Sequence, residues 1–328
     1  FFTLINEPLV IILALATILL GQDYLNIPVA ELIVFLFIVN RTAGLASTLI
    51  ASNNGFVAAI PSFEQIYALK NEAQLSQESQ KTKMIQHFQN ELCVSQLDFY
   101  YGEHQTLKNI SISIQKGKMT SIVGPSGSGK STLIDILMGY YQIKDGSISI
   151  DGTEFEKINL NSWRNLIGYI PQQPFLFNAS IRNNILWANN AITNEDMISA
   201  CKLAHVHDFV MEMKDGYETI VGERGMKLSG GQAQRICLAR AIASQPEILI
   251  LDEATSSLDS NSESLIQKSI ESLKGDITII SVAHRLSTIV NSNHIYYIEE
   301  GCLIEDGTFK DLMIKKGKFY TAAKLQGM

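Results

Sequence analysis

Cysteine and histidine are scarce and widely spaced in this sequence. The four cysteines form no Cys-x-x-Cys pair and no Cys/His spacing of the kind that zinc sites use. They are Cys93, Cys201, Cys237 and Cys302. His205 and His207 flank a single valine, and two histidines are too few ligands for a metal site, so we assign them no role. The pattern indicates free thiols in a reducing cytosol and argues against a disulfide framework or a zinc site.

Positive charge is also in short supply. The chain has 26 Lys and Arg against 33 Asp and Glu, a formal net charge of -7, and no Lys/Arg-rich run. A protein that binds nucleic acid normally needs a basic surface to neutralise phosphates. Nucleic acid is therefore not expected as a partner.

Charge of either sign is almost absent from the first sixty residues. Their charged side chains are Glu7, Asp23, Glu31 and Arg41. Two apolar runs, from Pro8 to Leu20 and from Val29 onward, are separated by the short segment 21–28. A bilayer core about 30 Å thick takes about twenty helical residues. The pattern predicts a transmembrane helical hairpin, with a buried hairpin of a soluble protein as the alternative.

The ends of the hairpin can be placed from local signals. The apolar start has no basic region and no small-residue cleavage site, so it is not a signal peptide. Because the chain opens with Phe1 rather than Met, we expect a piece of a longer polypeptide whose first helix begins upstream. The second helix should begin near Asn26, with Pro28 in its first turn, and run well past Arg41.

Topology and a possible transport pathway follow from the remaining charges. The loop carries Asp23 and no basic residue, whereas Lys70, Lys81 and Lys83 follow the second helix, so the loop is expected outside and the rest of the chain in the cytosol. Arg41 lies about 20 Å along the helix from Pro28 at 1.5 Å per residue. It either extends to the cytosolic headgroups or belongs to a polar face turned toward a translocation pathway. That face would also hold Asn40, Ser47, Thr48, Asn53 and Asn54.

A phosphate-binding loop is predicted at residues 124–132. The apolar strand 120–123 runs directly into GPSGSGKST, which leads into the apolar helix 133–138. This is the GxxxxGK[ST] pattern in its required context of strand, loop and helix. Its backbone N–H groups and helix amino terminus would hold phosphates, Lys130 would bridge the β and γ phosphates, and Ser131 would ligate Mg²⁺. The phosphate-binding residues are Gly124, Pro125, Ser126, Gly127, Ser128, Gly129, Lys130, Ser131 and Thr132.

Two carboxylates follow a second apolar strand. Residues 248–251 read as the buried strand of a parallel sheet, and Asp252 and Glu253 come at its end. Strand ends often carry capping acids, which is the structural alternative. Next to a phosphate loop, Asp252 is placed to hold the Mg²⁺ shell and Glu253 to polarise the attacking water.

The segment Leu228-Ser229-Gly230-Gly231-Gln232 resembles the signature of ABC ATPases, and the order and spacing of the other motifs agree with that family over residues 94–328. Residues 1–93 resemble, less specifically, the last two transmembrane helices of exporter-type half-transporters. The resemblance divides the chain into a transmembrane part (1–69), a helix extension and linker (70–93) and an ATP-binding domain (94–328). It implies a P-loop NTPase fold: a RecA-like α/β core, an antiparallel β subdomain and a helical subdomain, preceded by an all-α transmembrane hairpin.

The resemblance also assigns roles that the spacing does not. Tyr101, preferred over Tyr100, would stack on adenine, Gln172 would be the Q-loop residue and a Mg²⁺ ligand, and His284 would contact the γ-phosphate. Asp259 would be the D-loop residue, and Ser229, Gly230, Gly231 and Gln232 would contact ATP held by a partner subunit. The expected cofactors are ATP and Mg²⁺, and the catalytic group is Lys130, Gln172, Glu253 and His284. The segment 221–225 is also typical of exporters.

These motifs predict a transport ATPase. Two chains, either identical or different, would close head-to-tail around two nucleotides and drive export of an unidentified substrate across a membrane, with the lipid bilayer as a further partner. Gln173 and Ala233 depart from common family residues without removing a group that the chemistry needs. The alternatives are a soluble ABC ATPase acting on DNA or ribosomes and a membrane protein that uses ATP only for gating.

The expected layout of the ATP-binding domain is more detailed. An antiparallel region is predicted from residues 94–120 and 146–170, and a helical lobe between about Phe175 and Leu228. A β-ribbon is expected near 294–307, with turns at Glu300-Gly301 and Asp306-Gly307.

Overall fold

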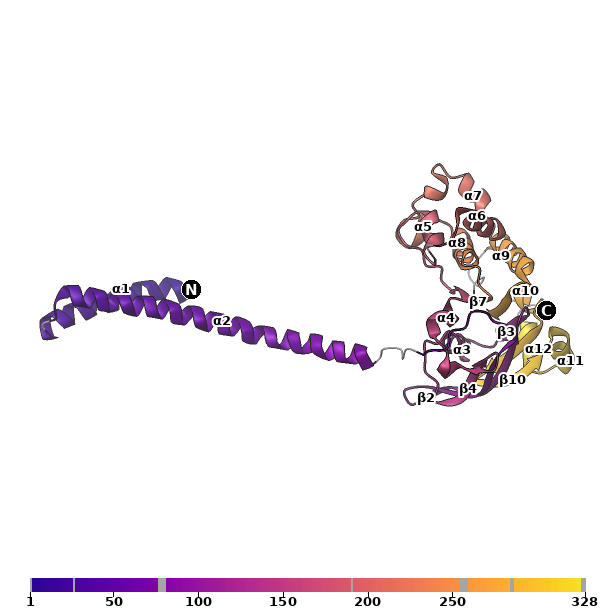
Figure 1. Cartoon of the computed structure of the whole chain (residues 1–328), viewed down its shortest axis with the longest axis horizontal. Coiled ribbons are helices and arrows are strands. Elements are labelled where there is room, and N and C mark those ends of the chain that lie inside the picture. Colours follow the sequence, from indigo (N-terminus) through magenta and orange to yellow (C-terminus); the bar gives the residue numbers. More distant parts are fainter. Residues whose placement is uncertain are drawn as a thin grey trace. The chain divides into compact units, whose positions relative to one another are not determined.

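The computed structural model describes residues 2–25, 27–75, 81–189, 191–253, 259–283 and 286–325. They fall into two compact units, Phe1–Ser79 and Gln80–Met328. The first is entirely helical, and the second is built on one large sheet (Figure 1).

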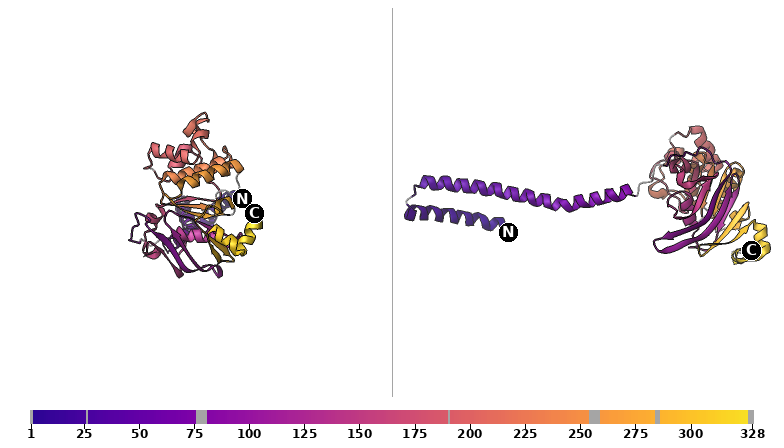
Figure 2. Two further views of the ribbon diagram at one scale, coloured as in Figure 1. Left: turned by 90° about the vertical axis from the view of Figure 1, so that its right-hand side faces the viewer. Right: turned by 60° about the horizontal axis from the view of Figure 1, so that its bottom comes forward.

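The first unit is a hairpin of two helices, α1 (Phe2–Leu25) and α2 (Val29–Leu75), which run side by side in the right-hand view of Figure 2. Pro28 immediately precedes α2, and its carbonyl accepts a hydrogen bond from the Glu31 N–H at 3.0 Å. The helices approach closely at Gly21, where a Cβ would lie 2.8 Å from a methyl of Leu32. The predicted hairpin is present, and α2 runs past Arg41 as expected.

The apolar side chains of this unit are mostly exposed. Among the described residues, one helix is long and apolar enough to cross a membrane, over Val29–Gln74, and its most apolar window is not buried at all. A shorter apolar stretch covers Val10–Gln22 in α1. A hairpin in the core of a soluble protein would bury these side chains, so the exposure favours the membrane interpretation.

The second unit contains a ten-stranded sheet in the order β5-β4-β1-β2-β10-β9-β3-β8-β7-β6. The strands are β1 (Glu91–Tyr101), β2 (His104–Gln115), β3 (Met119–Val123), β4 (Asp145–Ile150), β5 (Thr153–Glu154), β6 (Ile167–Ile170), β7 (Ile248–Asp252), β8 (Thr278–Val282), β9 (His294–Glu299) and β10 (Cys302–Gly307). The α-helices are α3 (Lys130–Leu137), α4 (Leu160–Arg164), α5 (Ile181–Leu186), α6 (Asn194–Leu203), α7 (His207–Met211), α8 (Gly230–Ala243), α9 (Ser260–Leu273), α10 (Leu286–Ile289), α11 (Phe309–Lys315) and α12 (Lys318–Leu325).

The sheet has a parallel half and an antiparallel half. Strands β6, β7, β8, β3 and β9 are parallel, and every residue of β3 and β8 is buried. Strands β2, β1, β4 and β5 are antiparallel, and β2 joins the other half through one parallel pairing, Cys302 with Lys108. The predicted α/β fold with an antiparallel region is confirmed.

One part of the predicted antiparallel region is wrong. Residues 146–170 were expected there, but β6 pairs parallel to β7 at the opposite edge of the sheet. The chain crosses over through α4, which is attached to the end of α3 because Trp163 is buried and donates from Nε1 to the Leu137 carbonyl at 2.8 Å. The sequence of β6 is only four residues long and does not indicate that β7 is its partner.

The predicted ribbon is present, and one of its strands also pairs with the main sheet. Strands β9 and β10 pair antiparallel around a turn at Glu300 and Gly301, both with positive φ. Strand β9 also pairs parallel to β3, so it is a central strand of the main sheet. Gly307 still belongs to β10, and Thr308 then caps α11, so the second expected turn is the start of a helix.

The helical lobe lies where predicted. Helices α5, α6 and α7 pack on α8, and their buried residues include Ile181, Met197 and Val210 beside Ile236 and Leu238. The lobe thereby covers a long helix whose first residue follows the signature serine. The lobe stands apart from the antiparallel strands in Figure 1.

Residues 81–91, part of the segment 70–93 that the sequence assigned to a helix extension and linker, belong to the second unit and are hydrogen-bonded to its other segments. Asp151 accepts from the backbone N–H groups of Gln89, Asn90 and Glu91 at 2.8, 2.7 and 3.0 Å. Glu247 accepts from the Phe88 N–H at 2.6 Å and contacts His87 Nδ1 at 2.6 Å. These contacts attach the entering chain to the sheet before β1 begins.

Replacing Asp151 tests how much this attachment stabilises the fold. Asp151→Ala removes one carboxylate that satisfies three N–H groups, so we expect a loss of about 2 kcal/mol, or roughly 4–8 °C in melting temperature for a unit of this size. Thermal unfolding followed by tryptophan fluorescence measures it, since both tryptophans, Trp163 and Trp187, lie in this unit. Asp276→Ala, at an exposed turn, is the matched control and should leave the melting temperature unchanged. Equal melting of the two variants would contradict the expectation.

Candidate nucleotide-binding site

The loop between β3 and α3 is shaped by its glycines. Gly124, Gly127 and Gly129 have φ of 155, 78 and 99°. A Cβ on Gly124 would lie 1.9 Å from the Ile298 carbonyl oxygen, and one on Gly129 would lie 2.5 Å from a Leu107 methyl. Since a side chain at Gly124 or Gly129 would collide with neighbouring strands, only glycine lets the backbone take this path at these two positions.

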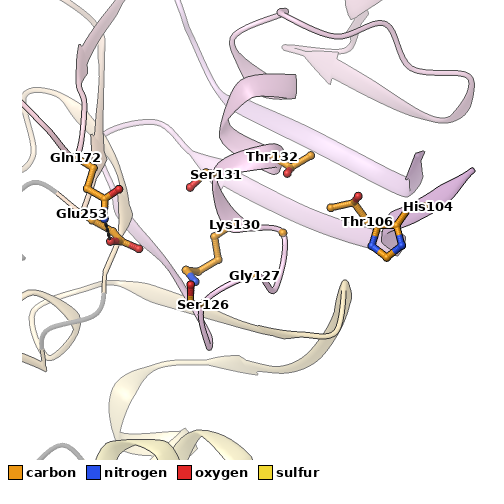
Figure 3. A pocket seen from close by; sticks show the side chains of 10 residues that line it. His104, Thr106, Ser126, Gly127, Lys130, Ser131, Thr132, Gln172 and Glu253 are labelled. Carbon is orange, nitrogen blue, oxygen red and sulfur yellow. Dashed lines mark hydrogen bonds between the residues drawn. The ribbon is translucent and has the colours of Figure 1, made fainter. Parts of the chain in front are cut away.

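A cavity of about 580 Å³ opens over this loop. Figure 3 shows Ser126, Gly127 and Lys130 at its centre, with Ser131 and Thr132 at the start of α3. Its lining residues are His104, Thr106, Ser126, Gly127, Gly129, Lys130, Ser131, Thr132, Gln172 and Glu253. Eight of these ten were named from the sequence, and they come from separate elements of the fold.

Lys130 is almost fully buried at the centre of the loop. Its Nζ donates to the carbonyls of Gly124 and Pro125 at 3.0 and 2.8 Å. Burial lowers the pKa of the ammonium group, and the charges of Glu253 and Asp252 oppose that shift. The lysine is therefore held against the loop. Its positive charge is poorly solvated and available to an anion.

Asp252 lies at the carboxyl end of β7. Its Oδ1 is 3.4 Å from Ser131 Oγ, and its Oδ2 accepts from the Tyr169 hydroxyl at 3.3 Å. Burial raises the pKa of this carboxyl group, the Tyr169 hydroxyl lowers it, and the Glu253 charge raises it further. A cation beside Asp252 would relieve the cost of keeping it ionised.

Glu253 and Gln172 follow neighbouring parallel strands, β7 and β6. Gln172 Nε2 donates to Glu253 Oε2 (Figure 3). Glu253 has a φ of 48°, rare for a non-glycine residue, and its N–H donates to the Val282 carbonyl at 3.0 Å. Strained backbone of this kind persists where the surroundings enforce it, and such residues cluster at functional sites.

The oxygen-rich group around Ser131 suits Mg²⁺ carried by a nucleotide. Mg²⁺ prefers oxygen ligands and is usually bound by one or two carboxylates together with substrate phosphates. Ser131, Asp252 and the Gln172 side chain supply one hydroxyl, one carboxylate and one amide oxygen near the loop. Among the described residues no cluster of three or more His, Cys, Asp or Glu side chains is able to hold a metal by itself.

Comparisons with known proteins identify the family. A family model described as ABC transporter matches residues 107–256. The heterocyst differentiation ATP-binding protein HepA of Nostoc sp. is 36% identical over 327 residues, which cover 98% of this chain and 53% of that protein. A Staphylococcus aureus protein described as a multidrug export ATP-binding/permease protein is 43% identical over 242 residues, covering 73% of this chain and 42% of its own length.

A solved structure of a bacterial Atm1-family ABC exporter with ATP bound superimposes with a TM-score of 0.76 at 28% identity, covering 98% of this chain and 57% of the exporter. The chain belongs to the ABC transporter family. It spans about half the length of the curated relatives that it matches.

Not all of the predicted site residues of this ABC transporter chain line the cavity. Ser229 caps α8 and forms a reciprocal pair of hydrogen bonds with Gln232, at 2.9 and 3.2 Å, outside the cavity lining. Gly231 lies against α9, since a Cβ there would be 2.1 Å from Ser262 Oγ. Gly230 is exposed in the same turn.

Two further predicted residues, Tyr101 and Asp259, lie at or beyond the edge of the site. Tyr101 is 43% exposed, and its ring packs edge-on against Phe99 and Tyr141 at 5.0 and 5.4 Å between centroids. Asp259 caps α9 by accepting from two backbone N–H groups, which lower the pKa of its carboxyl group. His284 lies outside the described residues. Ser128 is buried within the loop.

Sequence reasoning missed two residues that line the cavity, His104 and Thr106. They lie two residues apart at the start of β2, and His104 is paired across the strands with Tyr101. Alternating residues of a strand share a face. The position of Tyr101 was therefore a usable signal for His104, but nothing local marked Thr106.

The raised pKa of Asp252 predicts a pH-dependent effect on stability. Because the folded state raises this pKa above its unfolded value, ionised Asp252 costs stability at neutral pH, and the cost disappears as pH falls below the unfolded value. Asp252→Asn should therefore melt a few degrees higher than the parent without nucleotide at pH 7, and the gain should shrink toward pH 4. Thermal unfolding from pH 4 to 8 measures it, with exposed Asp276→Asn as control. A difference in melting temperature between Asp252→Asn and the parent that stays the same from pH 4 to 8 would contradict the raised pKa of Asp252.

Proposed function

We propose that this chain is the carboxy-terminal part of an exporter-type ABC half-transporter that binds and hydrolyses MgATP to drive export of a substrate across a membrane. The helical hairpin would lie in the bilayer, and the second unit would lie in the cytoplasm. The cavity over the β3–α3 loop carries this proposal, because it brings Lys130 together with acidic and amide groups from the ends of β7 and β6.

Each residue of the site would have a role that follows from its position. The loop N–H groups and Lys130 would hold the phosphates, and Ser131, Asp252 and Gln172 would hold Mg²⁺. Glu253, beside them, would accept a proton from the attacking water. Phosphoryl transfer depends on positioning and charge neutralisation more than on covalent chemistry, and these groups provide both.

The roles of the outlying residues follow the family pattern. Tyr101 would stack on the adenine, and His284 would contact the γ-phosphate. Asp259 and the four residues 229–232 would belong to the dimer interface. Signature residues that do not line their own chain's cavity fit a site completed by a second subunit with two-fold symmetry.

Glu253→Gln tests the assigned base. The amide keeps the size of the side chain but cannot take a proton, so ATP binding should persist while steady-state hydrolysis falls about 100-fold or more. Phosphate release and filter-bound nucleotide measure the two effects. Glu212→Gln, at the exposed end of α7, is the matched control and should hydrolyse ATP at the parent rate. Unchanged turnover in Glu253→Gln would remove Glu253 from this role.

Mixing two inactive variants tests whether the site is shared between subunits. Ser229→Arg should block the signature and Glu253→Gln should block the base, so each alone should be inactive. If the signature acts on the partner's nucleotide, mixed dimers contain one site with neither change, and ATPase activity reappears on mixing. If each chain completes its own site, no site is intact and activity stays absent. A double variant mixed with the parent chain is the control, since its mixed dimers have no intact shared site.

A further inference from the structure

Tyr169 lies on the strand next to Asp252 and on the same face of the sheet. Strands β6 and β7 are parallel, with Tyr169 opposite Ile250, and Asp252 comes two residues after Ile250. Alternating residues of a strand share a face. Ile250 and Tyr169 pack in the hydrophobic cluster that contains the buried apolar residues of α3, whereas Leu251 packs in the cluster of the helical lobe. Tyr169 and Asp252 are therefore on the face that α3 covers.

The length of the tyrosine side chain lets its hydroxyl reach the carboxylate. Two residues of a strand span about 6.6 Å, so only a long side chain at this position of β6 reaches Asp252. The Tyr169 hydroxyl donates to Asp252 Oδ2 at 3.3 Å, and both side chains are partly buried. Tyr169 is not among the residues that line the cavity. It is therefore placed to act on Asp252 and not on the nucleotide itself.

The two oxygens of the Asp252 carboxylate have different partners. Oδ1 is 3.4 Å from the Ser131 hydroxyl, and Oδ2 accepts from Tyr169. In the part of the chain that the structure describes, these are the two side chains that donate to this carboxylate. A carboxylate that ligates a metal is itself hydrogen-bonded as a rule, and its partner sets its orientation. Because Ser131 is also a proposed Mg²⁺ ligand, Tyr169 is the group left to hold Asp252 when the ion is bound.

The strand that carries Tyr169 is closely packed. All four residues of β6 pair with β7, and a Cβ on Gly168 would lie 3.0 Å from the Ala241 carbonyl oxygen of α8. Gln172, which lines the cavity, follows two residues after the end of β6. The same short strand therefore holds Tyr169 beside Asp252 and leads Gln172 into the cavity, so two of the three predicted Mg²⁺ ligands depend on it.

We propose that Tyr169 is a positioning residue for the Mg²⁺ ion of the nucleotide, and that its hydroxyl fixes the Asp252 carboxylate for metal binding. This inference rests on the proposed nucleotide-binding function, and it adds to the metal site a residue that lies outside the predicted motifs. Loss of the hydroxyl weakens nucleotide binding only when Mg²⁺ is present, because the loop and Lys130 hold the phosphates without it.

Tyr169→Phe removes the hydroxyl and keeps the ring that packs in the core. The ligand is adenylyl imidodiphosphate, an ATP analogue that is not hydrolysed, and its affinity for the purified full chain is measured by calorimetry with Mg²⁺ and with EDTA. Tyr169→Phe should bind it about 10-fold more weakly than the parent with Mg²⁺, and equally well with EDTA. Tyr320→Phe, which removes a hydroxyl from α12, is the matched control and should match the parent in both conditions. Thermal unfolding checks that each variant folds.

A second background tests whether Tyr169 acts through Asp252. Two residues that act through one hydrogen bond have non-additive effects. Asp252→Ala should weaken binding with Mg²⁺ by itself, and adding Tyr169→Phe to it should cause no further loss. A further 10-fold loss in that background would overturn the proposal, because the hydroxyl would then act on another group. An equal loss with Mg²⁺ and with EDTA in Tyr169→Phe would also overturn it, since the effect would not depend on the metal.

Failure of the underlying function gives a different result. If the parent chain does not bind the analogue, or if Lys130→Ala binds it as well as the parent, the phosphate site itself is refuted. If the parent binds equally well with Mg²⁺ and with EDTA, the Mg²⁺ assignment is refuted, and the role of Tyr169 with it. If the parent binds more tightly with Mg²⁺ and Lys130→Ala does not bind, while Tyr169→Phe matches the parent, the nucleotide site stands and positioning by Tyr169 is refuted.

Discussion

The close approach of the β3–α3 loop to neighbouring strands is the constraint on which the site depends. Gly124 runs so near the Ile298 carbonyl that no side chain fits between them. Gly129 is packed in the same way against β2. Because these contacts fix the loop backbone on two sides, its N–H groups need no reorganisation when phosphate binds, which is how a fixed polar site gains strength over water.

That arrangement gathers charge at an energetic cost. Lys130 and Asp252 are both displaced by burial from their ordinary pKa values, in opposite directions. The charges of Glu253 and Asp252 oppose the shift in the Lys130 pKa, and Lys130 opposes the shift in the Asp252 pKa, whereas Glu253 adds to the shift in the Asp252 pKa. A site of this kind is less favourable when empty than when filled, so the proposed Mg²⁺-bound nucleotide would stabilise the fold through the same interactions that hold it in the site.

The sequence predicted best what is encoded locally. The strand and the helix that flank the predicted phosphate loop, and the end of β7 with its two acids, depend on neighbours within a few residues, and the structure has these elements where the sequence predicted them. The edge position of β6 was missed because a four-residue strand acquires its partner from residues some eighty positions away. Thr106 was missed for a similar reason, since it is an extra residue at a β-bulge, which is a property of two paired strands and leaves no mark in one of them.

The attachment of residues 81–91 has a mechanical consequence. Glu247 accepts a hydrogen bond from the Phe88 N–H and immediately precedes β7. Asp252 is the last residue of that five-residue strand. A displacement of Phe88 would therefore act on the amino end of β7, and the carboxyl end of the same strand carries Asp252. A single strand, β7, thus joins the hydrogen bond to Phe88 with Asp252 and the Glu253 that follows it.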